Sequence, residues 1–396
     1  MAKKQIEKNP LKKGRANFEV VGEVGKIGDY TYSVEKTSDS GYKYSSLRLN
    51  VKVAENNSVS MEAMGGYFPN RVDNVIRVGA KDDPKERIEI AWVDRLKESI
   101  LDAVHSMSLI TIALERDVNN KLVYKHFLSW YDAIDYVQGH LQEGMRIKVR
   151  GNLTYSEYNN TVQVRKNIQT IFLADDKEKN HATFTQTILT QAGNADKSHA
   201  KEDKIIDIFA NIVDYEKGIG GNRAFSYPFK LRLKDGEEKK SLAMVKVIVP
   251  DDKKILREIT VEGHIVEGAE VTKFTADDIP DELRELIDCG IYTEEEILDK
   301  MVVKGNRVMN MYIDKPAITA AKEGQPSTLM RDDGKYTPED LIVEIQATEP
   351  VSQTSNKTED EELDAMVADL VGSDDISNAV SADEIDDDLS WMKELD

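Results

Sequence analysis

Alternating apolar and polar positions dominate the chain as far as residue 320 and predict a protein built mainly from β-strands. In Met145–Leu153 every second residue is apolar, and the residues between are Arg146, Lys148 and Arg150. Because side chains alternate between the two faces of a strand, such a segment presents one apolar face and one basic face. Ala224–Lys234 repeats this pattern with Lys and Arg. The sequence therefore predicts strands that bury one side and expose a positive other side.

The order of these segments indicates a barrel with a helix inserted before its fourth strand. The predicted strands are Phe18–Val24 continued by Tyr30–Val34, Tyr42–Val53, Val59–Met64, Met145–Leu153 and Thr161–Leu173. Between the third and fourth, a helix at Trp92–Ser106, a hairpin of Leu109–Leu114 with Leu122–Leu128, and a helix at Tyr131–Leu141 form an insertion. Three strands, a helix and a closing hairpin fit a five-stranded OB barrel.

The same order returns in the second half of the chain. Strands are predicted at Ile205–Tyr215, Ala224–Lys234, Leu242–Val249, Ile259–Val266 and Met301–Ile313, with helices at Asp251–Glu258 and in the acidic stretch Ile279–Lys300. Gly263, in the strand Ile259–Val266, parallels Gly151 in the first copy. The expected fold is thus mainly β with helical insertions, an α+β chain of tandem OB-like five-stranded barrels followed by a disordered acidic tail.

Shifts of composition set the expected domain boundaries. Five segments are expected: a basic flexible arm at 1–15, an OB-like domain with a long helical and hairpin insertion at 16–175, a linker at 176–204, a second OB-like domain with an acidic helical insertion at 205–320, and a disordered acidic tail at 321–396. Ala182–Gln191, inside the linker, could instead be one more strand.

Charge is concentrated at the end of the chain. The whole sequence has a formal net charge of −20, but residues 323–396 contain 22 acidic and 4 basic residues. The remainder, with 51 acidic and 49 basic residues, is nearly neutral. The acidic character therefore describes the tail, and it does not exclude a nucleic-acid partner for the body. At the tip, Ser381 and Glu384 form a capping box ahead of a predicted amphipathic helix.

The segment LQEGMRIKVRGNLTYSEYNNTVQVRKNIQTIFLA resembles the last two strands of OB folds in single-stranded DNA-binding proteins of the phage and bacterial replication type. An acidic tail with an apolar tip is also similar to that family, and implies that the tail recruits replication or recombination proteins. The tail could also occupy the basic groove until DNA displaces it. The ending DDDLSWMKELD departs from the familiar bacterial ending of acids, Pro and Phe.

Basic and aromatic residues on the strands are the candidate nucleic-acid contacts, because single-strand binders combine a positive groove with stacking platforms. They are Tyr44, Arg48, Lys52, Arg146, Lys148, Arg150, Tyr155, Tyr158, Arg165, Arg223, Phe225, Tyr227, Lys230, Arg232, Lys246, Lys304 and Arg307. The candidate partner-binding residues of the tail tip are Ile385, Leu389, Trp391, Met392 and Leu395.

Each of these candidates has a structural alternative. A half-exposed strand normally carries charge on its wet face, although neither Arg146/Lys148/Arg150 nor Lys230/Arg232/Lys234 has an acid interleaved. Phe225 and Tyr227 could equally belong to a core. The arm could contact phosphates or a neighbouring subunit, or have no role. The tail could be only a solubiliser.

The sequence gives little support to catalysis, metal binding or a membrane location. The six histidines lack metal-ligand spacing, and the single cysteine cannot build a thiolate zinc site. Gly218-Ile219-Gly220-Gly221 is not followed by Lys and Ser or Thr, as a phosphate-binding loop requires. We expect no enzyme activity, no catalytic residues, no cofactor and no metal. No stretch approaches the length of a membrane span, so a cytoplasmic protein is expected, in the host cytoplasm if a bacteriophage encodes it.

The sequence thus predicts sequence-tolerant binding and protection of single-stranded DNA in replication, recombination or repair. The expected partners are the DNA and, through the tail, replication or recombination proteins, and a homo-oligomer is possible. Two alternatives remain open: a structural or assembly protein such as a virion component, and a replication mediator that acts mainly through protein contacts.

Overall fold

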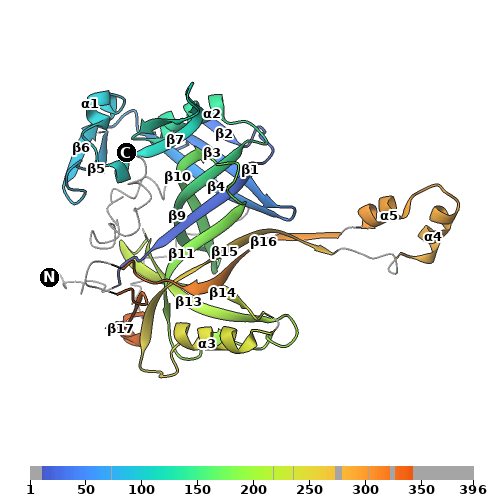
Figure 1. Ribbon diagram of the computed structural model, residues 1–396. Helices are drawn as coiled ribbons and strands as arrows, with labels where there is room; N and C mark the ends of the chain where they lie inside the picture. Colours follow the sequence, from blue (N-terminus) through green and yellow to red (C-terminus); the bar gives the residue numbers. More distant parts are fainter. Residues whose placement is uncertain are drawn as a thin grey trace.

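Most of the chain before the acidic tail is described by a computed structural model (Figure 1). The described residues are 11–341 except 73, 217, 235, 273–278, 302 and 322–325, and the side chains of 269–272, 299 and 303–307 are also outside the description. The predicted amphipathic tip at 385–395 and residues 1–10 of the basic arm lie outside the described residues. The expected mainly β composition is confirmed.

The first half of the chain closes into a ring of five strands, called ring 1. Its strands are β1 (Ala16–Val24), β3 (Lys43–Ala54), β4 (Asn57–Tyr67), β9 (Arg146–Tyr158) and β10 (Thr161–Leu173). β1 pairs with β3 and β9, β3 with β4, and β10 with β9, all antiparallel, while β4 and β10 are parallel. Ring closure pairs the first strand with the fourth and the third with the fifth.

The second half closes into ring 2 with the same order. Its strands are β11 (His181–Thr190), β13 (Ile205–Glu216), β14 (Gly221–Arg232), β15 (Leu256–Thr272) and β16 (Val303–Pro316). β11 pairs with β13 and β15, β13 with β14, and β15 with β16, all antiparallel, while β14 and β16 are parallel. β11 lies within the segment 176–204 that was expected as a linker, so that expectation is corrected, and the alternative of a strand at Ala182–Gln191 is confirmed.

Two glycines mark the equivalence of the rings. A Cβ on Gly151 would lie 1.9 Å from the carbonyl oxygen of Asn167 and 2.8 Å from Phe18, and one on Gly263 would lie 2.0 Å from the oxygen of Tyr312 and 2.7 Å from Phe184. Phe18 and Phe184 each come from the first strand of their ring and sit opposite the glycine in register. Only glycine lets the strands approach this closely, so the predicted parallel between Gly151 and Gly263 has a packing reason.

The two rings share one continuous sheet. β1 and β11, the first strands of the two rings, pair antiparallel from Ala16 opposite Gln186 to Val21 opposite His181. A single hydrophobic cluster runs through both rings and includes Phe18, Phe184 and Phe229. Pairing and packing therefore hold the rings as one body.

The insertion of ring 1 differs from the prediction in its first part. Its elements are β5 (Val75–Gly79), β6 (Arg87–Ala91), η1 (Trp92–Asp94), α1 (Glu98–Leu101), η2 (Ser106–Ser108), β7 (Ile110–Arg116), β8 (Leu122–Phe127) and α2 (Trp130–His140). The helix expected at Trp92–Ser106 is instead three short turns, while the β7–β8 hairpin and α2 agree with the expectation. β2 (Tyr32–Thr37) pairs with β3.

The helix of ring 2 lies one segment earlier than expected. α3 (Glu238–Ile248) covers most of Leu242–Val249, which was expected as a strand, and the helix expected at Asp251–Glu258 is a turn leading into β15. The residues that α3 buries are Ser241, Val245 and Ile248, at the i, i+4, i+7 spacing of a helix. The cluster of apolar residues at 244–249 obscured this period.

The ends of the described chain pack together on ring 2. Leu11 is 1% exposed and lies in one cluster with Leu256 and Tyr336, and the backbone N–H of Lys12 donates to the hydroxyl of Tyr336. Tyr336 belongs to β17 (Arg331–Tyr336), which pairs with β15 and is followed by η4 (Pro338–Leu341). Residues 11–15 and 331–341 are therefore ordered parts of the body, contrary to the arm and tail boundaries expected. β12 (Ala195–Asp196) adds a short strand beside β13.

β15 and β16 continue beyond ring 2 as a long hairpin that carries two helices at its far end (Figure 1). These are α4 (Asp281–Asp288) and α5 (Glu294–Met301). They form the helical part of the acidic insertion that the sequence predicts, and Thr293 with Glu296 makes a capping box at the start of α5.

Candidate nucleic-acid interface

The basic stripe of β9 is engaged within the protein. The predicted alternation is correct, since Ile147 and Val149 are fully buried and the basic residues lie on the other face. However, Lys148 pairs with Glu178 at 2.6 Å and Arg150 pairs with Glu19 at 2.5 Å. These acids come from a neighbouring strand and a loop, so no acid had to be interleaved in β9 for the stripe to be neutralised.

Arg146 holds the segment that connects the rings. Its guanidinium donates to the carbonyl oxygens of Asp175, Asp176 and Glu178 and to Oδ1 of Asn180, at 2.6–3.2 Å. These four acceptors all lie between β10 and β11. Arg146, Lys148 and Arg150 together form what we call the linker clasp, whose contacts are structural.

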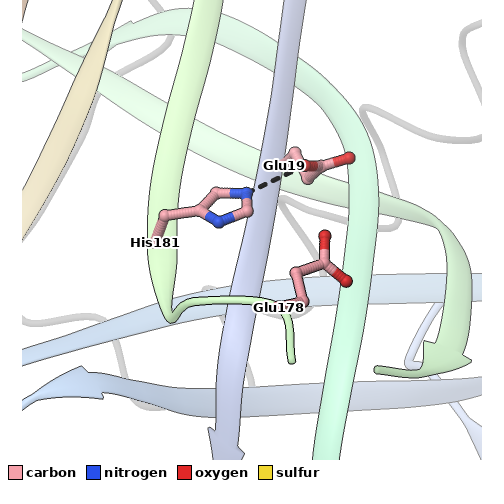
Figure 2. Close-up of side chains that lie close together, drawn as sticks. All are labelled: Glu19, Glu178 and His181. Atoms are coloured by element: carbon pink, nitrogen blue, oxygen red, sulfur yellow. Dashed lines mark hydrogen bonds and ion pairs between the residues drawn. The ribbon is translucent and has the colours of Figure 1, made fainter. Parts of the chain in front are cut away.

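Glu19, Glu178 and His181 converge beside this clasp (Figure 2). His181 Nε2 lies 2.8 Å from Oε1 of Glu19. Burial alone would raise the pKa of Glu19, but the hydrogen bond with His181 and the charges of Arg150 and Lys148 lower that pKa to about 2. The hydrogen bond with Glu19 raises the pKa of His181 against the opposing effect of burial.

The same three side chains are of types that bind divalent metals. Among the described residues they form the one cluster with suitable spacing. Both carboxylates, however, already accept a cationic side chain, from Lys148 and Arg150. A metal ion would have to displace these cations, so the arrangement favours an ion-pair network over a metal site.

Four predicted aromatic contacts belong to the core instead. Tyr44, Tyr155, Phe225 and Tyr227 are 2–8% exposed. Tyr155 and Tyr227 meet edge to face at 5.8 Å between the rings, and the hydroxyl of Tyr155 donates to Oε1 of Gln186. Burial raises the pKa of Tyr227 to about 12. Tyr155, Phe225 and Tyr227 lie on the apolar faces of their strands, whereas Tyr44 shares the parity of Arg48 and is buried in a separate cluster with Tyr42 and Met64.

Arg223 and Arg165 are paired with acids. Arg223 lies between Glu216, at 2.8 Å, and Glu157 of ring 1. Arg165 lies 3.8 Å from Glu62. Tyr158, at the tip of the β9–β10 hairpin, is 48% exposed. Arg223 therefore fastens the hairpin of ring 1 to ring 2.

The predicted contacts that remain exposed lie on the outer faces of β3 and β14 and on the helix α3. Arg48 and Lys52 lie on the outer face of β3, and neither forms an ion pair with a described residue. Lys246 is exposed on α3. Lys230 and Arg232 lie on the outer face of β14. The side chains of Lys304 and Arg307 are outside the described residues.

The outer face of ring 2 combines these cations with planar groups. The guanidinium of Arg232 lies 5.0 Å from the ring centre of Tyr312, and His264 stacks on Tyr312 at 5.1 Å with an interplanar angle of 8°. We call Arg232, Tyr312 and His264 the stacked column; Tyr312 at its centre is only 7% exposed, so the accessible groups are Arg232 and His264 at its ends. Asp314 accepts from Nδ1 of His264 at 2.8 Å, and Lys230, 3.5 Å from Asp207, lies opposite Tyr312 in register.

An exposed aromatic residue extends this surface across β13. Phe209 is 43% exposed and sits opposite Pro228 of β14. Its strand position places it on the same face as Lys230 and Arg232. Sequence reasoning missed Phe209, Tyr312 and His264. The sequence does contain a signal for Phe209. It lies two residues from Asp207 and from Asn211, so alternation places it on the polar face of its strand.

No helix among the described residues is long and apolar enough to cross a membrane.

Comparisons with known proteins identify a family. The sequence model of the YorF family matches residues 16–362, and the chain therefore belongs to the YorF family. No curated protein matches the sequence.

Two solved structures of the single-stranded DNA binding protein from Thermus aquaticus align with this chain. A deletion mutant aligns with a TM-score of 0.29 and 10% identity, over 64% of this chain and 88% of that chain. The wild-type protein aligns with a TM-score of 0.28 and 9% identity, over 64% and 86% respectively. Similarity at this level does not establish a shared fold.

Proposed function

We propose that this member of the YorF family binds single-stranded DNA with little sequence preference, in replication or recombination, and without enzymatic activity of its own. The observation that carries the proposal is the outer face of ring 2. There the stacked column lies beside Lys230 and the exposed ring of Phe209. Positive charge interleaved with planar groups is the pattern by which proteins bind single strands.

The chemistry of this face explains sequence tolerance. Lys230 and Arg232 would neutralise phosphates, which are the same for every nucleotide. Bases would stack on Phe209 and on the ends of the column, and every base has a π-face to offer. Such a stack contributes about 1–3 kcal/mol per base without reading the base edge.

The proposal interprets both rings as OB barrels. In each ring the fifth strand pairs parallel with the third and a helix precedes the fourth. OB barrels bind oligonucleotides on the face of their second and third strands. In ring 2 these are β13 and β14, which carry Phe209, Lys230 and Arg232.

The acidic tail would have two roles in this proposal. Residues 350–396 contain 15 acidic and 2 basic residues, and could compete with DNA for the cationic face. The apolar residues near Trp391 would recruit replication or recombination proteins. The support for both roles is the sequence alone, since this segment lies outside the described residues.

The test is binding of an oligo-dT of about 40 nucleotides by the full chain at low and high salt. Lys230→Ser with Arg232→Ser should weaken binding and lower the magnitude of the salt slope by about 1.4, because each neutralised phosphate contributes about 0.7 on single strands. Lys253→Ser with Lys254→Ser is the matched control, since these exposed lysines lie in the turn before β15.

Three outcomes would contradict the proposal. Undetectable binding at low salt would favour the structural or assembly protein. Weak DNA binding together with strong capture of a replication protein by the tail would favour the mediator. Equal affinity for duplex and single strand would refute the stacking surface.

A further inference from the structure

The open outer face of ring 2 has a boundary on β13. Ile208, Ala210 and Ile212 are 0–1% exposed and belong to the core of the ring. β13 pairs with β14 in one continuous register, so the odd-numbered residues of β13 lie on its outer face. On that face Phe209 is 43% exposed, whereas Val213 is only 6% exposed. The open surface therefore ends between Phe209 and Val213.

The cover over Val213 comes from the start of the described chain. Val213 belongs to the same hydrophobic cluster as Leu11, and Ala224, its partner in register on β14, packs against that cluster. The carbonyl oxygen of Leu11 accepts a hydrogen bond from Nδ2 of Asn222 at 2.8 Å. Leu11 is thus fixed on the outer side of ring 2, where the open surface ends.

Contacts of the next residues show the path by which the chain arrives there. The backbone N–H of Arg15 donates to the hydroxyl of Thr187 on β11 at 3.0 Å. The ammonium of Lys13 lies 2.6 Å from Asp214 of β13. Followed backwards from Arg15 to Leu11, the chain passes from β11 over β13 to β14. The preceding residues therefore start beside the strand that carries Lys230 and Arg232.

Those preceding residues are rich in lysine. Residues 1–10 read MAKKQIEKNP and contain Lys3, Lys4 and Lys8 against the single acid Glu7. The sequence alone left three roles open for this segment: contact with phosphates, contact with a neighbouring subunit, or none. The position of Leu11 now favours the first role, because it attaches these lysines to the margin of the surface proposed to bind DNA.

The segment is also long enough to reach across that surface. Phe209 is four positions from Val213 along β13, which is about 13 Å at the rise of a strand. The residue opposite Lys230 is six positions from Val213, or about 20 Å. Ten residues can span at most about 33–36 Å. Lysines placed three to eight residues before Leu11 can therefore meet phosphates along the whole open face.

We propose that Lys3, Lys4 and Lys8 neutralise phosphates of the single strand that ring 2 binds, and that Leu11 is the positioning residue that keeps them beside it. This inference rests on the proposed function and adds to it a second, tethered set of cations. Attachment at Leu11 turns their contact with DNA into an intramolecular event, at an effective concentration set by the short tether. The phosphates they contact would belong to nucleotides whose bases stack on Phe209.

The first experiment removes the three lysines from the full-length protein. Lys3→Ser, Lys4→Ser and Lys8→Ser together should weaken binding of an oligo-dT of about 40 nucleotides about tenfold at low salt. The magnitude of the salt slope should fall by about 2.1, because each neutralised phosphate contributes about 0.7. The control changes the net charge equally at three exposed cations of the β5–β6 hairpin on ring 1: Lys81→Ser, Lys85→Ser and Arg87→Ser.

The second experiment releases the tether and keeps the charges. Leu11→Ala should weaken binding of the same oligo-dT severalfold while leaving the salt slope close to that of the wild type, since the lysines remain but are no longer held at the site. Both proteins are measured well below their melting temperatures, so that the loss reports position. An unchanged affinity would overturn the role of Leu11.

The remaining outcomes separate this proposal from the proposed function. Wild-type binding with an unchanged affinity and slope in the triple lysine variant would overturn the phosphate contacts and leave the function standing. An equal loss in the charge-matched control would also overturn them. Acetylation of lysines followed by mass spectrometry should show Lys3, Lys4 and Lys8 protected only when oligo-dT is present. Protection without DNA would assign them to the acidic tail or a neighbouring subunit. Failure of the wild type to bind oligo-dT would refute the proposed function itself.

Discussion

Ring 1 and ring 2 have the same strand order but use their basic residues differently. In ring 1, Lys148 and Arg150 of the fourth strand are paired with acids, and Arg146 holds the connecting loop. In ring 2, Arg232 of the third strand is exposed and its guanidinium stacks over the ring of Tyr312. The hairpin of ring 2 also contacts ring 1 at Ser60, whereas Phe209 is 43% exposed and Arg232 is exposed. The basic residues of β9 thus serve as support within the protein, whereas Arg232 of β14 remains exposed.

The strongest way to break this division is to remove the cation buried between the rings. Lys166→Met removes the buried ammonium that neutralises the carboxylate of Glu267, which costs about 3–5 kcal/mol in comparable sites. We expect that loss in the free energy of unfolding, measured by urea denaturation. The exposed pair Lys315–Glu262 is the control, and Lys315→Met should cost less than about 1 kcal/mol. Equal losses of unfolding free energy in Lys166→Met and Lys315→Met would mean that the contact between the rings is not tight.

The second comparison sets the linker clasp against the stacked column. Arg146→Ser, Lys148→Ser and Arg150→Ser together should lower the free energy of unfolding by about 1–3 kcal/mol, because they remove hydrogen bonds to charged groups. Their effect on DNA affinity should be small. The sequence alone led to the opposite expectation, an intact fold with weaker binding.

Lys230→Ser with Arg232→Ser should do the reverse, with a stability change below about 1 kcal/mol and about tenfold weaker binding of oligo-dT. Melting temperature and filter binding on the same preparations measure both quantities. If the clasp variant loses affinity while remaining fully stable, the two surfaces have been assigned the wrong roles.

Removing residues 350–396 tests whether the exposed face of ring 2 is regulated. The truncation changes the formal net charge from −20 to −7. Binding of oligo-dT should become several-fold tighter at low salt, where charges are screened least, and should approach the full-length value at high salt. Trp391→Ala leaves the charge unchanged and should affect only capture of a partner protein. Identical binding curves with and without the tail would identify it as a solubiliser.

The smallest expected effect is a pH dependence of the pair of Glu19 and His181 beside the linker clasp. The pKa of His181 is raised, so its contribution is complete below the ordinary value of about 6.5 and is lost as pH rises through the raised value. The pKa of Glu19 is lowered to about 2, so its contribution is present above about 4.5 and is lost as pH falls toward 2.

The difference in stability between the wild type and His181→Gln should therefore be largest between about pH 4.5 and 6.5, and below about 1 kcal/mol because both groups are partly exposed. Thermal melts across that range measure it. A difference that grows above pH 7 would contradict the assignment.

Sequence periodicity predicted most strands of the two rings because the barrels bury every second residue, but it mistook the helix α3 for a strand. The paired glycines and α2 were also predicted correctly, since each depends on local pattern. The prediction of the nucleic-acid contacts failed where it depended on residues far away in the sequence. The acids that neutralise β9 lie on β1 and on the loop before β11, and nothing in the residues 145–153 reveals them. The exposed Phe209 and the stack of His264 on Tyr312 required knowledge of which strands are neighbours.

The misplaced boundaries have the same origin. Leu11 and Tyr336 looked like isolated apolar residues in polar segments, and only their mutual packing on Leu256 makes them part of the core. β11 could be predicted from the sequence only as an alternative to a linker, and its pairing with β1 and β15 makes it the first strand of ring 2.

The contact between the two ends of the described chain also has a consequence for synthesis. The backbone N–H of Lys12 is hydrogen-bonded to the hydroxyl of Tyr336, which lies 324 residues later in the sequence. Since translation proceeds at about 5–20 residues per second, the first of these residues emerges roughly 16–65 seconds before the second. During that interval ring 1 can close on the ribosome, but the site for Leu11 on ring 2 does not yet exist. Residues 11–15 can therefore dock on ring 2 only after nearly the whole body has been synthesised. Their docking occurs once both rings are complete.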